Sequence, residues 1–284
     1  MTTQGRFSVT ALYVFGQCVK IKLERAMSRT DYSALDRPEI LAFVFYPRKD
    51  FTRTPPNASD YFIPVDKDVS IFCRFYIHSR SSPSILYFHG NGEVVSDHDY
   101  IAPIYNQLGI NLFVADYRGY GASQGRPTLS NTVSDAPIIF RTFSAILQQE
   151  LYSSDIFVMG RSLGSISAIE IAHRYQEQMK GLIIESGFAA LINLLFHLGL
   201  SAESLGIEDL EFPNLAKIRT ITIPILIIHG EYDQIIPPSE GEALFHNAAA
   251  KDRRLVIIPG ANHNDIMLAG MEKYFKAIKE FTFA

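Results

Sequence analysis

The chain has 284 residues, 47% of them hydrophobic, which is enough for one large domain built around a single core. Its formal net charge of −4 argues against a nucleic-acid partner, because such a partner selects for a basic patch or stripe. Only Cys18 and Cys73 occur, so no disulfide framework is implied and a reducing, cytoplasmic location is expected.

The N-terminal region is predicted to be an extension, residues 1–56, packed on or beside the main domain at 57–284. The apolar run 7–15 is too short to span a bilayer and lacks the basic start and cleavage site of a signal peptide. We interpret it as a helix docked on the domain, with peripheral membrane contact as the alternative. Residues 37–47 are expected to form a short helix or strand that ends at a proline.

The middle and C-terminal parts of the chain carry two successive hydrophobic patterns. Residues 60–65 and 69–77 alternate in polarity, which predicts an antiparallel hairpin at a sheet edge. From residue 84 onward, short apolar runs alternate with amphipathic helical stretches, which predicts a mostly parallel sheet with helices on both faces. The expected strands are 85–88, 111–115, 156–159, 181–184, 223–228 and 254–258, and the expected helices are about 97–108, 131–151, 163–178, 239–249 and 264–281.

The sequence Gly160-Arg-Ser-Leu-Gly164 connects a predicted strand to a predicted helix. Strand, G-x-S-x-G and helix in that order are typical of the nucleophile elbow of α/β-hydrolases. A serine on such a tight turn occupies strained backbone, and the flanking glycines leave room for the chain to close. Ser162 is therefore predicted to be a nucleophile, and the fold to be that of an α/β-hydrolase.

A serine nucleophile requires a general base and an acid that orients it. In α/β-hydrolases these follow in the chain order serine, acid, histidine, on loops after strands. His263 follows the last predicted strand and Asp233 the strand before it, so we predict them to be base and acid. Glu185 and Asp116 also follow strands and are rival acids, although Asp116 is expected instead to fix the loop of Arg118.

The loop after the first buried strand reads His89-Gly-Asn-Gly92. In this fold that loop donates one N–H to the oxyanion hole, and the residue after the nucleophile donates the other. The backbone N–H groups of Asn91 and Leu163 are therefore the predicted donors. No cofactor and no metal are expected, because no His, Cys or Asp cluster has ligand spacing.

Residues 188–212 interrupt the regular alternation, since a long apolar stretch is followed there by an acidic one. This position suits a small helical cap over the pocket, and an ordinary crossover helix packed on the sheet is the alternative. Leu191, Leu195 and Phe196 are the candidate pocket residues on the cap interpretation.

From about residue 60 to the C-terminus, the chain resembles the α/β-hydrolase superfamily. Four stretches, residues 89–92, 116–125, 212–218 and 263–266, resemble eukaryotic α/β-hydrolase-domain depalmitoylases and related bacterial hydrolases. The resemblance implies removal of acyl groups from protein cysteines. Those depalmitoylases carry a cysteine-rich, lipidated N-terminus, whereas this chain has only Cys18 near its start.

These observations favour a serine hydrolase that cleaves carboxylic esters or thioesters of acyl chains through an acyl-enzyme intermediate. Its partner would be a small ester, a thioester or an acylated substrate. A serine peptidase or amidase on the same triad is an alternative, because fold and triad do not choose the acyl donor. A non-catalytic binding module on this scaffold is the remaining alternative. Dehalogenase and epoxide-hydrolase chemistry is disfavoured, because those enzymes use a carboxylate as the nucleophile.

Overall fold

The computed structural model describes residues 32–190, 195, 199, 203 and 214–284. Residues Ser33–Ala284 form one compact unit, so the segment 33–56 groups with the sheet and the division of the chain falls before it. The run 7–15, interpreted above as a docked helix, lies outside the described residues. Within the described part of the chain, no helix is long and apolar enough to cross a membrane.

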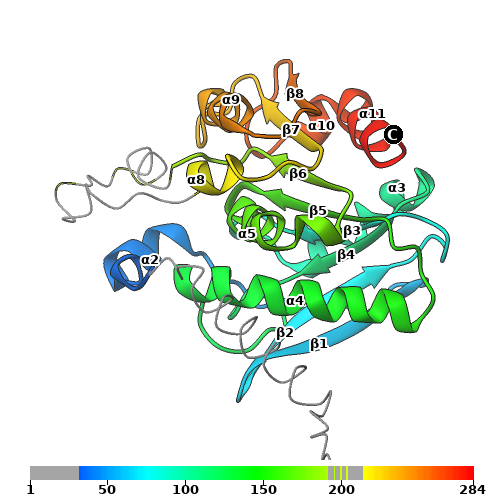
Figure 1. Cartoon of the computed structure of the whole chain (residues 1–284). Helices are drawn as coiled ribbons and strands as arrows, with labels where there is room; N and C mark the ends of the chain where they lie inside the picture. Colours follow the sequence, from blue (N-terminus) through cyan, green and yellow to red (C-terminus); the bar gives the residue numbers. More distant parts are fainter. Residues whose placement is uncertain (1–31, 191–194, 196–198, 200–202, 204–213) are drawn as a thin grey trace, which may run out of the picture. The chain divides into compact units, whose positions relative to one another are not determined.

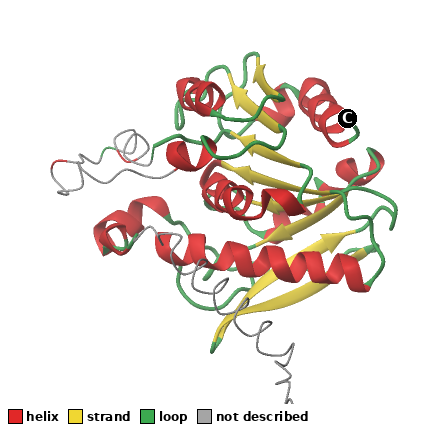
Figure 2. Ribbon diagram, viewed as in Figure 1, coloured by secondary structure: helices red, strands yellow, loops and turns green. Residues whose placement is uncertain are grey.

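The core of this unit is one eight-stranded sheet with the strand order β1-β2-β4-β3-β5-β6-β7-β8 (Figures 1 and 2). The strands are β1 (Ala58–Asp66), β2 (Val69–Tyr76), β3 (Ser84–Phe88), β4 (Asn111–Ala115), β5 (Ile156–Arg161), β6 (Gly181–Glu185), β7 (Ile225–Gly230) and β8 (Arg253–Ile258). The hairpin β1–β2 is antiparallel and β2 joins β4 antiparallel, whereas β3 to β8 pair in parallel. The predicted edge hairpin and mostly parallel sheet are both confirmed.

The apolar runs of the central strands follow from their burial on both faces. Every residue of β3, β4, β5, β6 and β7 is buried. The edge strand β1 is mostly part-exposed, and its sequence is correspondingly mixed. A continuous apolar run therefore marks a strand covered by helices above and below.

Helices cover the sheet on both faces. Within the described part of the chain, the α-helices are α2 (Pro38–Val44), α3 (Ala102–Gln107), α4 (Leu129–Gln149), α5 (Ser165–Tyr175), α8 (Asn214–Ile218), α9 (Pro238–Asn247), α10 (Ile266–Ala269) and α11 (Met271–Thr282). Helices α4 and α5 lie in front of the sheet in Figure 1 and contact each other. Tyr105 of α3 and Phe275 and Ile278 of α11 join an apolar cluster with the sheet strands.

Two of the predicted helices are divided in the structure. The stretch expected at about 97–108 consists of a 3₁₀ helix, η2 (Val95–Asp99), and α3, which has Pro103 in its first turn. Proline lacks an N–H, so it suits the start of a helix and not its middle. The stretch expected at 264–281 breaks at Gly270, between α10 and α11, where glycine is a poor helix former.

The expected cap falls mostly on residues outside the described part of the chain. Within 188–212, only residues 188–190, 195, 199 and 203 are described. Of the candidate pocket residues, Leu191 and Phe196 lie outside the described residues, and Leu195 is buried with 1% of its surface exposed.

Candidate active site

The serine elbow lies where β5 gives way to α5. Ser162 opens a one-turn 3₁₀ helix, η3 (Ser162–Gly164), directly after the end of β5. Its φ of 51° lies in the left-handed region, which is costly for a residue with a Cβ and is found where the surrounding structure fixes the turn. Ser162 thus directly follows the carboxyl end of β5, at the edge of the sheet where the residues after parallel strands meet.

The glycine at the end of the motif is required by close packing. A Cβ on Gly164 would lie less than 3.0 Å from the carbonyl oxygen of Phe88 at the end of β3. The position of a Cβ is fixed by the backbone, and the Phe88 oxygen is itself a backbone atom, so no side-chain rotation can relieve the contact. The elbow can therefore approach β3 only if this residue has no side chain.

We expect Gly164→Ala to lower the free energy of unfolding by about 3 kcal/mol or more, since overpacking a rigid site costs roughly this amount. The matched control is Gly260→Ala, whose φ is 72° but whose added Cβ would meet nothing within 4 Å. In that variant the free energy of unfolding should fall by only about 1 kcal/mol, the cost of a residue with a Cβ in the left-handed region. Chemical unfolding of both variants tests this. A loss in Gly164→Ala no larger than that in Gly260→Ala would mean that the structure relieves the contact with β3, because alanine readily adopts the φ of Gly164, −62°.

Three predicted residues come together above the sheet, from loops far apart in sequence. His263 Nε2 lies 3.0 Å from Ser162 Oγ, and His263 Nδ1 lies 2.7 Å from Asp233 Oδ2. All three residues are buried. A carboxylate can only accept, so Nδ1 carries the proton and Nε2 is left to accept the serine hydroxyl. This is the hydrogen-bonded order that a nucleophile, a base and an orienting acid require.

The Asp233 carboxylate is fixed by its own loop. Its Oδ1 accepts the backbone N–H groups of Ile235 at 3.0 Å and Ile236 at 2.8 Å. Burial alone would raise the pKa of Asp233, but interactions with His229 and His263 and the Ile236 N–H hold it well below its usual value. The group therefore stays ionised and can stabilise an imidazolium.

Neither rival acid contacts the base. Glu185 is fully buried at the end of β6, where it accepts from Arg161 Nε at 3.1 Å and from the Tyr274 hydroxyl at 2.7 Å. Asp116 accepts the Val95 N–H at 2.9 Å and lies 3.2 Å from His89 Nε2.

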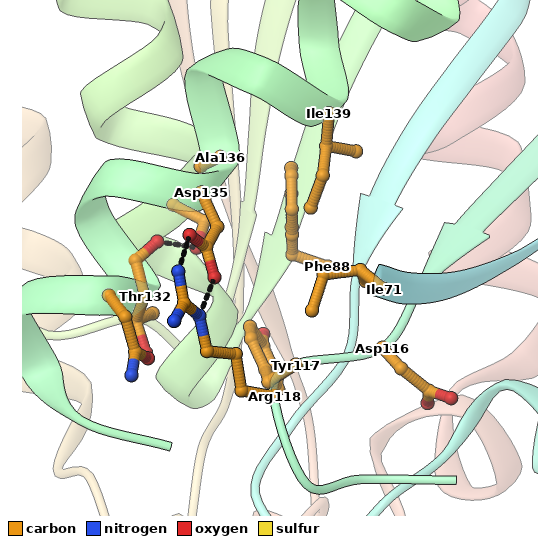
Figure 3. A pocket seen from close by; sticks show the side chains of 11 residues that line it. Ile71, Phe88, Asp116, Tyr117, Arg118, Thr132, Asp135, Ala136 and Ile139 are labelled. Carbon is orange, nitrogen blue, oxygen red and sulfur yellow. Dashed lines mark hydrogen bonds and ion pairs between the residues drawn. The ribbon is translucent and has the colours of Figure 1, made fainter. Parts of the chain in front are cut away.

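The side chain of Asp116, expected to fix the Arg118 loop, has no hydrogen bond or ion pair with Arg118 itself. Arg118 extends toward α4, where Nε and Nη2 donate to the two oxygens of Asp135 at 2.7 and 2.8 Å (Figure 3). A bidentate carboxylate suits the planar guanidinium, and the Asp116 carboxyl is used instead to hold the loop after β3.

The predicted oxyanion donors flank the serine because of the strand register. β3 and β5 are neighbours in parallel, and Phe88 lies opposite Gly160, so the loop after β3 lies beside the elbow. Among the described residues, no acceptor contacts the Asn91 N–H. Leu163 is in the first turn of η3, where backbone N–H groups have no partner within the helix. We therefore expect both N–H groups to be available to an oxyanion.

The side chain of Asn91 has a role that the sequence did not indicate. Its Oδ1 accepts the backbone N–H of Tyr46 at 2.8 Å and the hydroxyl of Tyr120 at 2.6 Å. Arg48 Nε donates to the Gly92 carbonyl at 2.9 Å. The segment that follows α2 thus donates hydrogen bonds to the loop after β3 and helps to fix its position. Backbone donors can come from any residue type, so no sequence pattern marks them.

Two cavities in the described part of the chain lie away from the serine. One, of about 10 Å³, lies beside the Arg118–Asp135 pair (Figure 3) and has room for about one water molecule. The other, of about 560 Å³, is lined by residues at the amino ends of strands, including Asp155 and Pro224, and by the last four residues. Ser162, Asp233 and His263 line neither of them, so neither is the site of their chemistry.

The sheet order and the serine elbow define a hydrolase of the α/β-hydrolase type. Residues 79–203 and 214–267 match the α/β-hydrolase family described as serine aminopeptidase, S33, and the chain belongs to that family.

Relatives and solved structures agree with this assignment. The chain is 32% identical over 219 residues to human alpha/beta hydrolase domain-containing protein 17B, covering 74% of this chain and 70% of that protein. The structure of the Pyrococcus furiosus esterase Pf2001 has a TM-score of 0.68 at 17% identity, covering 83% of this chain and 97% of that one. A monoacylglycerol lipase from Paleococcus ferrophilus has a TM-score of 0.57 at 20% identity, with 76% and 98% covered. At these identities the two structures establish the shared fold.

Proposed function

We propose that the protein is a serine hydrolase that cleaves carboxylic esters or thioesters through an acyl-enzyme intermediate. The observation that carries the proposal is the continuous chain of hydrogen bonds from Ser162 through His263 to Asp233, at 3.0 and 2.7 Å. A buried, ionised acid at one end and a hydroxyl on a strained turn at the other suit acyl transfer.

The first half of the reaction forms the acyl-enzyme. Ser162 Oγ attacks the carbonyl carbon while His263 Nε2 takes the hydroxyl proton, and Asp233 stabilises the resulting imidazolium. The N–H groups of Asn91 and Leu163 bind the oxyanion of the tetrahedral intermediate. When the intermediate collapses, the bond to the alcohol or thiol breaks and His263 gives its proton to that leaving group.

The second half of the reaction returns the enzyme to its starting state. A water molecule attacks the acyl-serine carbonyl while His263 Nε2 accepts one of its protons. The same N–H groups bind the second oxyanion. Collapse of this intermediate returns the proton to Ser162 and releases a carboxylic acid.

An acyl-chain substrate is supported by the sequence resemblance to the α/β-hydrolase-domain depalmitoylases, and by the esterase and lipase names of the structural neighbours. The candidate acyl pocket consists of Leu191, Leu195 and Phe196. Hydrolysis of p-nitrophenyl esters beside a palmitoyl-cysteine peptide tests the reaction class. Turnover of either substrate supports the proposal, and turnover of neither contradicts it.

A peptidase or amidase is the second candidate, and the family description, serine aminopeptidase, favours it specifically. The same triad can act on amides, because the fold does not choose the acyl donor. Amino-acid p-nitroanilides run beside the corresponding p-nitrophenyl esters separate the two candidates. A higher kcat/KM for unblocked anilides than for acyl esters would favour the peptidase.

We expect kcat/KM to rise with acyl length until the pocket is full, by up to about 0.8 kcal/mol, or roughly fourfold, per buried methylene. Leu195→Ala should flatten that rise and leave acetyl-ester turnover unchanged. The matched control is Leu147→Ala on α4, which is also buried but distant in sequence from the pocket residues. A series of p-nitrophenyl esters of graded length tests both variants. Equal impairment of every ester by Leu195→Ala, with a lower Tm, would mean that Leu195 belongs to the core.

A further inference from the structure

Arg161, the residue directly before Ser162, has a buried guanidinium that the reaction described above does not use. Only 4% of its surface is exposed, at the end of β5. Nη1 lies 2.5 Å from Glu93 Oε1, and Nε donates to Glu185 at 3.1 Å. Nη2 donates to the His263 carbonyl at 2.8 Å. One side chain thus has a partner in each of three directions.

These partners lie on the loops that carry the other parts of the site. Glu93 closes a turn of the oxyanion loop, because its second oxygen accepts the Gly90 N–H at 2.9 Å. The His263 carbonyl belongs to the base's own residue, and the Asn264 side chain also accepts from Nη2, at 3.3 Å. The guanidinium therefore connects the nucleophile's strand with both the oxyanion loop and the histidine loop.

The residues around the Arg161 guanidinium are affected by its size and its charge. A Cβ on Gly90 would lie less than 3.0 Å from Arg161 Nη1, so a larger residue at this position of the His-Gly-Asn-Gly loop would displace the guanidinium. Burial would raise the pKa of Glu93, but the charge of Arg161 lowers it below its usual value. The pKa of Glu185 is raised by burial in spite of Arg161 and the Tyr274 hydroxyl.

We propose that Arg161 is a positioning residue that holds the histidine loop and the oxyanion loop at fixed distances from Ser162. The inference rests on the proposed serine-hydrolase function. A planar fork with five N–H donors can reach a carboxylate on each side and a carbonyl, whereas a lysine ammonium is a single point charge on a flexible stem. Loss of the fork should therefore loosen both loops at once, and a misplacement of about 1 Å in a catalytic group can cost about 10²-fold in rate.

The test compares Arg161→Lys with Arg74→Lys. Arg74 is a matched control because it is also buried and bridges two carboxylates, Asp60 and Asp99. Among the described residues, its hydrogen bonds reach neither the elbow nor the histidine and oxyanion loops. The concentration of active sites is measured by titration with a fluorophosphonate, so that kcat is expressed per reactive serine. This normalisation removes the effect of partial unfolding, which lowers the number of sites and not their kcat.

We expect Arg161→Lys to lower kcat per titrated site by about 10²-fold with little change in KM, and Arg74→Lys to leave both unchanged. An unchanged kcat per site in Arg161→Lys would overturn the proposal. If that variant does not fold, Glu93→Gln decides in its place, since it removes one charged partner of Arg161 and keeps an acceptor for the Gly90 N–H. A fall of about tenfold in kcat per site then supports the proposal, and no fall overturns it.

A second readout separates failure of this inference from failure of the proposed function. The proton shared by His263 Nδ1 and Asp233 is expected far downfield in the proton NMR spectrum, whether or not a substrate has been found. The resonance should disappear in Arg161→Lys and persist in Arg74→Lys. If the wild type neither hydrolyses esters nor reacts with the probe, the proposed function fails. In that case, persistence of the resonance in Arg161→Lys would overturn the positioning role independently.

Discussion

Replacement of Ser162 by alanine is expected to lower ester hydrolysis by about 10⁶-fold, the scale seen when a triad serine is removed. Without the hydroxyl no acyl-enzyme can form, and the remaining groups can only assist a water molecule. The fold should persist, because the side chain gives up one hydrogen bond, at 3.0 Å to His263, and the new residue is of similar size. Initial rates with a p-nitrophenyl ester, together with the Tm, test both expectations.

The control for that experiment is Ser167→Ala. Ser167 is a buried serine of α5 whose hydroxyl donates to the Thr132 carbonyl at 3.2 Å. It should keep wild-type turnover. Retention of activity by Ser162→Ala would remove the nucleophile assignment and with it the proposed mechanism.

Replacement of Asp233 by asparagine is expected to lower kcat by about 10⁴-fold, as when a triad acid loses its charge. An amide can donate to His263 Nδ1, which would place the imidazole proton on Nε2 and prevent that nitrogen from accepting the serine proton. The two backbone N–H groups that bind Oδ1, at 3.0 and 2.8 Å, can still bind the amide oxygen, so the loop should keep its shape. Steady-state kinetics measure the effect.

Glu185→Gln serves as the comparison, because Glu185 also follows a strand and is buried. It contacts Arg161 and Tyr274 and has no hydrogen bond to the base. Its neutralisation should cost far less in kcat than that of Asp233. The reverse ranking would transfer the role of acid to Glu185 and leave Asp233 as a loop residue.

The fold was predictable because burial leaves a direct signal in sequence. Continuous apolar runs mark β3 to β7, which are buried on both faces, and the serine motif lies between one of them and a helix. Parallel strands bring their carboxyl ends to one edge, so the residues that follow them meet there. This is why the spatial proximity of Ser162, Asp233 and His263 could be anticipated from their order.

The side-chain contacts that support the site could not be predicted from the sequence in the same way. Arg118 turned out to pair with Asp135 on α4, because a long side chain can reach partners in several directions and its sequence neighbours do not select one. The Asn91 side chain is held by a hydrogen bond from the backbone N–H of Tyr46, which a residue of almost any type could donate. The bridging role of Arg161 depends on two loops meeting, and sequence spacing does not report on that.

The most direct test of the central claim is to locate the covalent bond to the enzyme. The protein is reacted with a fluorophosphonate, digested, and analysed by tandem mass spectrometry. The account predicts one stoichiometric phosphonyl adduct, on Ser162, that forms much more slowly in Asp233→Asn because His263 no longer accepts the serine proton. Absence of an adduct, or an adduct on a different serine, would contradict it.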